Sequence, residues 1–277
     1  MDGYLKVIDL GHVIEVYEME RVPVDPHWFE KKDNYNPFDF TTDLEITKKR
    51  NLELYQEHEE LRKEKQNRKE ERRSQTIRDA RNRCRRIALM NFSEKDTFMT
   101  LTFAENISDI QYADNEFKKF IKRFNYKYNR KSKFLAVREF QKRGAIHYHI
   151  LIDWSLPSTL EKESLRELER YFGVSVWKHG FVKLLSLKKR ETDNSPVDNV
   201  GAYIIKYMTK DLYEKKMTHN NIYLCSRKLK RPTILIQEEA AELLNRVNIT
   251  NYKEVFSNDY SSEFLGKITY KEYNLLR

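Results

Sequence analysis

Cysteine is nearly absent from this chain, and long apolar runs are missing. Cys84 and Cys225 are the only two cysteines, which excludes a disulfide-stabilised scaffold and a cysteine-rich zinc module. No run approaches the about 18 apolar residues of a membrane-spanning helix. The first twenty residues are acidic, where a signal peptide would be basic. We therefore expect a soluble, cytoplasmic protein with no membrane partner.

Charge, in contrast, is abundant and unevenly spread. Lys and Arg outnumber Asp and Glu by 52 to 43, a formal net charge of +9. Residues 1–50 hold 7 basic and 11 acidic side chains, so the basic excess lies further along the chain. An excess of this kind favours a polyanionic partner. Aromatic residues make up 13% and supply core material, so global disorder is not expected.

The densest basic stretch runs from residue 61 to residue 86. It holds twelve basic residues against four acidic ones and contains neither Gly nor Pro, which predicts a helix. Its cations could follow nucleic-acid phosphates, or they could form a solvated face held by i,i+4 ion pairs. Crowding near the end of the stretch favours DNA contact by five arginines: Arg78, Arg81, Arg83, Arg85 and Arg86.

The middle of the chain alternates between strand and helix patterns. Four segments rich in β-branched and aromatic residues predict strands, over 98–103, 134–140, 145–152 and 181–185. After the first strand, Asp109 caps a helix with Phe117 and Phe124 on its apolar side. The other side of that helix is basic, with Lys118, Lys119, Lys122 and Arg123. Further helices are predicted over 158–172 and from Ser195-Pro196 onward.

This order of elements predicts an α+β fold. It corresponds to a ferredoxin-like (split βαβ) antiparallel sheet with helices on one face. We expect this domain to span residues 87–237, after a basic helix over 61–86. Residues 1–60 and 238–277 are then N- and C-terminal extensions, to which the sequence assigns no role.

A His-x-His pair lies within the third predicted strand. Residues i and i+2 of a strand face the same side, so His147 and His149 converge while Tyr148 points away. A three-residue hairpin loop over 142–144, with Gly144 left-handed, places Glu139 opposite His147. Two imidazoles and one carboxylate with open positions suit Mg²⁺ or Mn²⁺. The competing interpretation is two half-buried histidines that bond to sheet neighbours, because short motifs occur by chance.

The helix after Ser195 carries a polar stripe with two phenols and two ammonium groups. Tyr203, Lys206, Tyr207 and Lys210 fall within about 100° of one another, while Ile204, Ile205, Met208 and Leu212 take the side expected to be buried. A phenol with a pKa near 10 needs a neighbouring cation to act as a nucleophile, and Lys206 stands one turn after Tyr203. We therefore predict Tyr203 as the first nucleophile. The alternative is a pair of rim aromatics packed against lysine stems.

Together these blocks resemble the rolling-circle replication initiators of the HUH endonuclease superfamily, in particular the filamentous-phage gene II-like group. The resemblance covers roughly residues 87–236 and rests on three blocks in order: 98–103, 139–149 and 201–210. It implies a ferredoxin-like sheet that binds one divalent ion. It also implies a tyrosine that cleaves one strand of origin DNA, stays joined to the 5′ phosphate and leaves a 3′-OH for a DNA polymerase. No G-x-x-x-x-G-K-[ST] motif is present, so a separate helicase or supercoiling would have to unwind the DNA.

Two alternatives remain at this point. One is a non-catalytic DNA-binding regulator on the same fold, and the other is a single-tyrosine transposase of the superfamily. A nicking assay on supercoiled or single-stranded origin DNA separates the first alternative from a nicking and joining enzyme.

Overall fold

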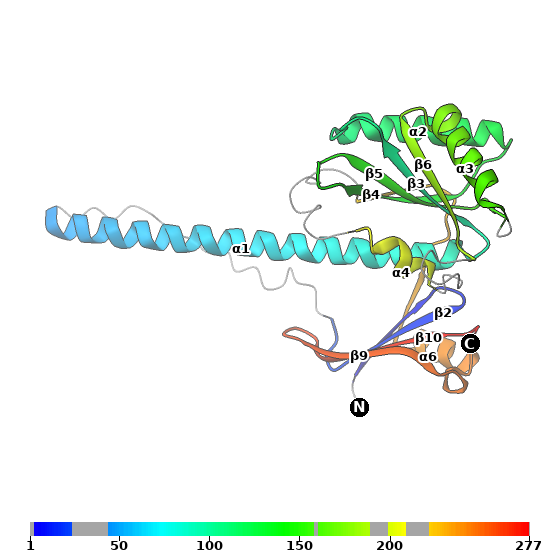
Figure 1. The fold of residues 1–277 in the computed structure, drawn as a ribbon. Coiled ribbons are helices and arrows are strands. Elements are labelled where there is room, and N and C mark those ends of the chain that lie inside the picture. The colour runs from blue at the N-terminus through cyan, green and yellow to red at the C-terminus, as the bar shows by residue number, and fades with distance from the viewer. Residues whose placement is uncertain (1–2, 24–43, 158–159, 189–198, 209–221, 277) are drawn as a thin grey trace.

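The computed structural model describes residues 3–23, 44–157, 160–188, 199–208 and 222–276 (Figure 1). These residues form two five-stranded antiparallel sheets and five α-helices, which confirms the predicted α+β class. None of the described helices is long and apolar enough to cross a membrane.

The first sheet contains the four strands expected from the sequence and one more. Its strand order is β6-β3-β5-β4-β7. The bounds are β3 Thr97–Phe103, β4 Phe134–Phe140, β5 Ile146–Ile152, β6 Gly180–Ser186 and β7 Tyr223–Cys225. The short strand β7 was not predicted, because three residues carry too little period-two pattern to identify a strand.

Two helices cover one face of this sheet, and both follow from their sequence patterns. In α2 (Ile110–Lys127) the Asp109 side chain accepts hydrogen bonds from the backbone N–H groups of Gln111 and Tyr112. The predicted apolar side of α2 is buried, and Phe117 stacks on Tyr148 of β5 with ring centroids 4.7 Å apart. The second helix, α3 (Lys162–Tyr171), continues into a π-helical segment, η2 (Phe172–Trp177).

The opposite face is covered as well, which corrects the prediction of helices on one face only. There α4 (Val200–Ile205) and the last turns of α1 (Leu44–Asn91) lie against the sheet (Figure 1). Ile77, Cys84 and Ile87 of α1 are buried at i, i+7 and i+10, and Ala80 between them is buried too. The many basic residues of this stretch made its narrow apolar stripe hard to recognise. The sequence therefore indicated a helix exposed on all sides, whereas one side of the helix is part of the core.

The helix α1 is far longer than the predicted basic helix. Its 48 residues span about 72 Å at the standard rise per residue. Its N-terminal part extends well beyond both sheets, and its C-terminal part lies between them (Figure 1).

The second sheet joins the two ends of the chain. Its order is β8-β1-β2-β10-β9. The strands are β1 Tyr4–Asp9, β2 Val13–Met19, β8 Thr233–Ile236, β9 Glu254–Ser262 and β10 Gly266–Asn274. On one face, α6 (Gln237–Arg246) buries Ala240 and Leu243 against Val7 and Val16, and a 3₁₀ turn, η3 (Ile249–Asn251), follows. Residues that the sequence presented as separate terminal segments thus pair directly, since β2 and β10 are neighbours.

Candidate functional site

The hairpin between β4 and β5 aligns the predicted ligands. Gly144 has φ of +90°, a left-handed conformation that glycine adopts without a Cβ clash. The chain closes with a hydrogen bond from the Gln141 N–H to the Ala145 carbonyl, 2.8 Å. In the resulting register Glu139 pairs with His147, as the sequence predicted. The turn therefore fixes which carboxylate faces which imidazole.

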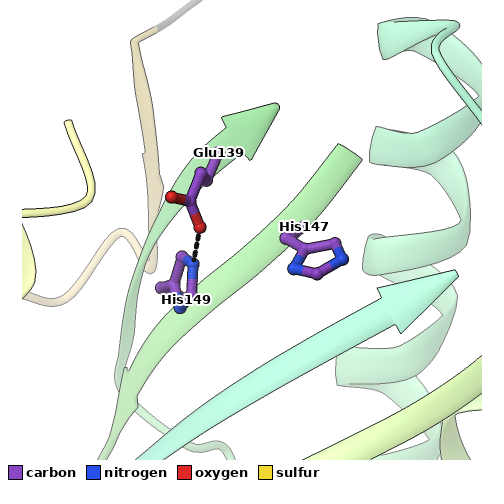
Figure 2. A group of neighbouring side chains, drawn as sticks. All are labelled: Glu139, His147 and His149. Carbon is purple, nitrogen blue, oxygen red and sulfur yellow. Dashed lines mark hydrogen bonds and ion pairs between the residues drawn. The ribbon is translucent and has the colours of Figure 1, made fainter. Parts of the chain in front are cut away.

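Glu139, His147 and His149 form a compact group on this face of the first sheet (Figure 2). One ligand atom from each residue lies within 4.8 Å of the others. His149 Nε2 and Glu139 Oε2 are 2.6 Å apart, and His149 Nδ1 lies 3.2 Å from the hydroxyl of Thr100 on β3. The predicted convergence of these three side chains is confirmed.

The surroundings of this group favour neutral imidazoles next to a charged carboxylate. Burial lowers the pKa of His149, although Glu139 partly opposes the effect. Burial and the neighbouring His149 also lower the pKa of His147. The hydrogen bond with His149 lowers the pKa of Glu139. These are the protonation states in which all three groups can ligate a cation, because metal ligands must be deprotonated.

The surroundings of His147 indicate whether a metal ion fits this group. The Nε2 of His147 is buried and has no hydrogen-bond partner among the residues that the structure describes, which costs free energy unless another species satisfies the nitrogen. Next to it lies an open hollow of about 610 Å³ lined by Glu139, Arg143 and His147, among others. Two imidazole nitrogens and one carboxylate oxygen beside an open hollow fit a divalent ion that keeps free coordination positions.

The tyrosine helix α4 lies close to this group. Asn199 caps α4, because its side chain accepts a hydrogen bond from the Ala202 N–H. The predicted start at Ser195-Pro196 lies outside the described residues, as do Lys210 and Leu212. Ile204 and Met208 are buried, and Tyr203 and Tyr207 are half-buried. Ile204 and Met208 thus lie on the side predicted to be buried, whereas Ile205, also predicted there, is only half-buried like the two tyrosines.

Gly201 explains how α4 comes so near to α1. A Cβ at this position would lie 2.8 Å from the backbone oxygen of Arg85, a closer approach than side chains tolerate. The absence of a side chain lets the two helices touch, and this contact sets the distance from the tyrosines to the sheet.

Tyr207 lies at the edge of the metal-ligand group, and Tyr203 lies next to Tyr207, with ring centroids 6.1 Å apart. The ring of Tyr207 stacks on His149, with centroids 3.7 Å apart and an interplanar angle of 17°. The Lys206 ammonium lies 3.7 Å from the ring centroid of Tyr203 and 4.8 Å from that of Tyr207. Lys206 is exposed, so the cation also remains accessible to an anionic ligand.

A second hollow, of about 180 Å³, separates the tyrosines from β6. It is lined by Thr100, Lys183, Tyr203 and Tyr207, together with Phe98 and Leu185. The sequence did not single out Thr100 or Lys183. Strand register is the signal that could have identified them, because Thr100 on the central strand β3 pairs with His149 on β5 and with Lys183 on β6.

The five arginines of α1 do not share one environment. Arg85 donates hydrogen bonds to Glu15 and Glu272, and Arg86 donates to Glu15 and Tyr17. Only 15% of the Arg85 side chain and 16% of the Arg86 side chain are exposed. Two arginines held this way cannot reach DNA phosphates, so we revise the prediction for them and assign both to the joint between α1 and the second sheet.

The other three arginines lie elsewhere on α1. Arg81 donates to the Met208 carbonyl, 2.8 Å, and so ties α1 to the end of the tyrosine segment. Arg78 and Arg83 are exposed and remain candidates for DNA contact.

A comparison with known protein families gives one match for the segment that contains this site. A family model for replication-associated proteins of the ORF2 and phage gene II type matches residues 96–212. This segment is similar to the gene II-like replication family. The gene II-like segment includes β3, the metal-ligand hairpin and the tyrosine helix. Neither a search of curated proteins nor a search of solved structures found a match.

Proposed function

We propose that this protein initiates rolling-circle replication by nicking and rejoining one DNA strand through a tyrosine. The observation that carries the proposal is the contact between Tyr207, two residues after the end of α4, and His149 of the ligand group. The family match and the candidate cation site support this proposal, and Tyr203 lies next to Tyr207 with ring centroids 6.1 Å apart. The strand order β6-β3-β5-β4, with α2 and α3 on one face, supports a ferredoxin-like core.

Each side chain has a defined task in this proposal. Glu139, His147 and His149 hold Mg²⁺ or Mn²⁺, which polarises the scissile phosphate when bound. Tyr203 attacks phosphorus through its phenolic oxygen, and Lys206 stabilises the negative charge that develops. The phenol gives up its proton as its oxygen bonds to phosphorus, the bond from phosphorus to the 3′ oxygen breaks, that oxygen takes up a proton, and the 5′ phosphate stays on the tyrosine. Attack by a 3′-OH on the phosphotyrosine reverses these steps and rejoins the strand.

Tyr207 is the competing nucleophile. Its ring lies against His149, whereas Tyr203 has the closer contact with Lys206. We assign Tyr203 to the first cleavage and Tyr207 to a later transfer. The proposed partners are origin DNA, contacted in part by Arg78, Arg83 and Lys210, together with a separate helicase and a DNA polymerase.

A randomised single-stranded DNA library tests the proposal for any origin sequence. The protein is incubated with the library and Mn²⁺, and DNA that remains attached after denaturation is sequenced. We expect attached strands with a common sequence at their 5′ ends, and no attachment for His147→Ala or in the presence of EDTA. A protein that binds a library sequence but attaches no strand covalently is the regulator, and nicking is then excluded.

A further inference from the structure

The helix α2 and the segment after it carry a dense run of basic side chains to which the proposed function assigns no role. Residues 117–133 contain eight Lys and Arg and no Asp or Glu. The metal-ligand group lies on one face of the first sheet, and α2 covers the other (Figure 1). The basic side of α2 is therefore separate from the candidate active site.

Several of these cations are exposed and free of carboxylate partners. Glu116 holds Lys119 at 2.7 Å, and Asp153 holds Arg130 at 2.9 Å. In the described part of the chain, no carboxylate pairs with Lys118, Lys122 or Lys127. These three lysines spread over about 14 Å of the helix.

An aromatic side chain stands among these lysines. Tyr126 is 89% exposed, the highest exposure of the large apolar and aromatic residues on this face. It lines two open hollows of about 620 and 570 Å³, and Lys122 lines both of them too. One hollow also contains Tyr171, with the Lys127 ammonium 4.2 Å from its ring centroid.

We infer that this side of α2 is a second binding surface for single-stranded DNA, distinct from the metal centre. Clustered cations follow a phosphate backbone, and an exposed aromatic ring between them stacks an unpaired base. Duplex DNA would satisfy the lysines but offers no free base face to Tyr126. An anionic single strand with unpaired bases is therefore the ligand whose chemistry matches both features. This surface would hold a stretch of strand other than the one at the metal centre.

The test measures equilibrium binding of fluorescent oligo(dT) to the full chain in EDTA, as a function of salt concentration. Lys118→Gln with Lys122→Gln removes two contacts, which should reduce the salt slope by roughly 1.4 for a single strand. The matched control is Lys253→Gln with Lys267→Gln, two exposed lysines, one just before β9 and one in β10, which should leave the slope unchanged. An equal effect in both variants, or no effect in either, would overturn the assignment.

Tyr126 separates single strands from duplex. Tyr126→Ala should weaken oligo(dT) binding about fivefold or more, while Tyr126→Trp should retain it. Duplex that binds as tightly as oligo(dT), with no effect of Tyr126→Ala on either, would contradict a single-strand surface. The assay contains EDTA and therefore no free divalent ion, so the result does not depend on whether the metal centre nicks DNA.

Discussion

His147 and His149 lie two residues apart but have different local environments. His149 is fixed by Glu139, Thr100 and the ring of Tyr207, whereas the Nε2 of His147 has no partner within the described residues. His147→Ala should therefore remove a ligand without breaking a hydrogen bond of that nitrogen. We expect Mn²⁺ affinity to fall by more than about 100-fold, beyond the loss typical of residues that only support a ligand.

Isothermal titration with Mn²⁺ measures this change, and thermal unfolding should stay within a few degrees of the parent protein. His12→Ala, in the second sheet, is the matched control and should bind Mn²⁺ normally. Unchanged affinity in His147→Ala would show that the group is not a metal site.

Gly201 provides a second prediction at the scale of one residue. Gly201→Ala places a methyl group 2.8 Å from the Arg85 backbone oxygen, so α4 must shift away from α1. We expect a loss of roughly 1–3 kcal/mol in the free energy of unfolding, the range for overpacked sites. Urea denaturation measures the loss, with Ala202→Ser at the neighbouring exposed position as the control. Equal stability of the two variants would mean that the helices do not touch here.

Among the elements, the β4–β5 hairpin is the one that local sequence determines most completely. Gly144 sets the loop, the two-residue period of the strands sets the faces, and the register follows, so Glu139 and His147 could be paired from sequence alone. The helix α1 shows why the rest could not. Arg85 and Arg86 have the same composition signal as Arg78, and their acidic partners stand about 70 or more residues away in sequence. A local sequence pattern cannot predict an ion-pair partner that lies so far away in the chain.

The prediction of DNA contact by α1 now depends on its exposed arginines, Arg78 and Arg83. Arg78→Gln with Arg83→Gln should lower the salt slope of DNA binding by roughly 0.7–0.9 for each lost contact. Arg227→Gln with Arg246→Gln, two exposed arginines elsewhere, is the charge-matched control. Filter binding across a salt series measures the slopes. If the two pairs behave alike, Arg78 and Arg83 form only a solvated face.

At the scale of the whole molecule, one ion-pair cluster joins α1 to the second sheet. Glu15 is 1% exposed and accepts hydrogen bonds from both Arg85 and Arg86, and Glu272 accepts from Arg85 and from Tyr270. Burial raises the pKa of Tyr17 and of Tyr270, so both phenols stay protonated as donors at neutral pH. The cluster holds the strands from both chain ends against the helix that also supports α4.

Glu15→Gln should reveal the strength of this joint. It leaves two buried guanidinium groups with too little negative charge, and removal of one partner from a buried pair costs roughly 3–5 kcal/mol. Glu18→Gln is the control, because Glu18 is exposed and lies 3.6 Å from Lys271, a contact worth less than about 1 kcal/mol. Guanidinium denaturation that gives equal losses would show that the cluster does not stabilise the assembly of the two sheets.

The most direct measurement of the proposed chemistry is peptide mapping of the covalent DNA adduct. After reaction with single-stranded DNA and Mn²⁺, nuclease and tryptic digestion leave a nucleotide on the tyrosine that attacked, and mass spectrometry locates it. We predict the nucleotide on Tyr203, its loss in Tyr203→Phe, and its retention in Tyr207→Phe. A modification mainly on Tyr207 would reverse the assignment of the two tyrosines. A modification on neither residue, with the strand cleaved, would contradict nicking by Tyr203 or Tyr207.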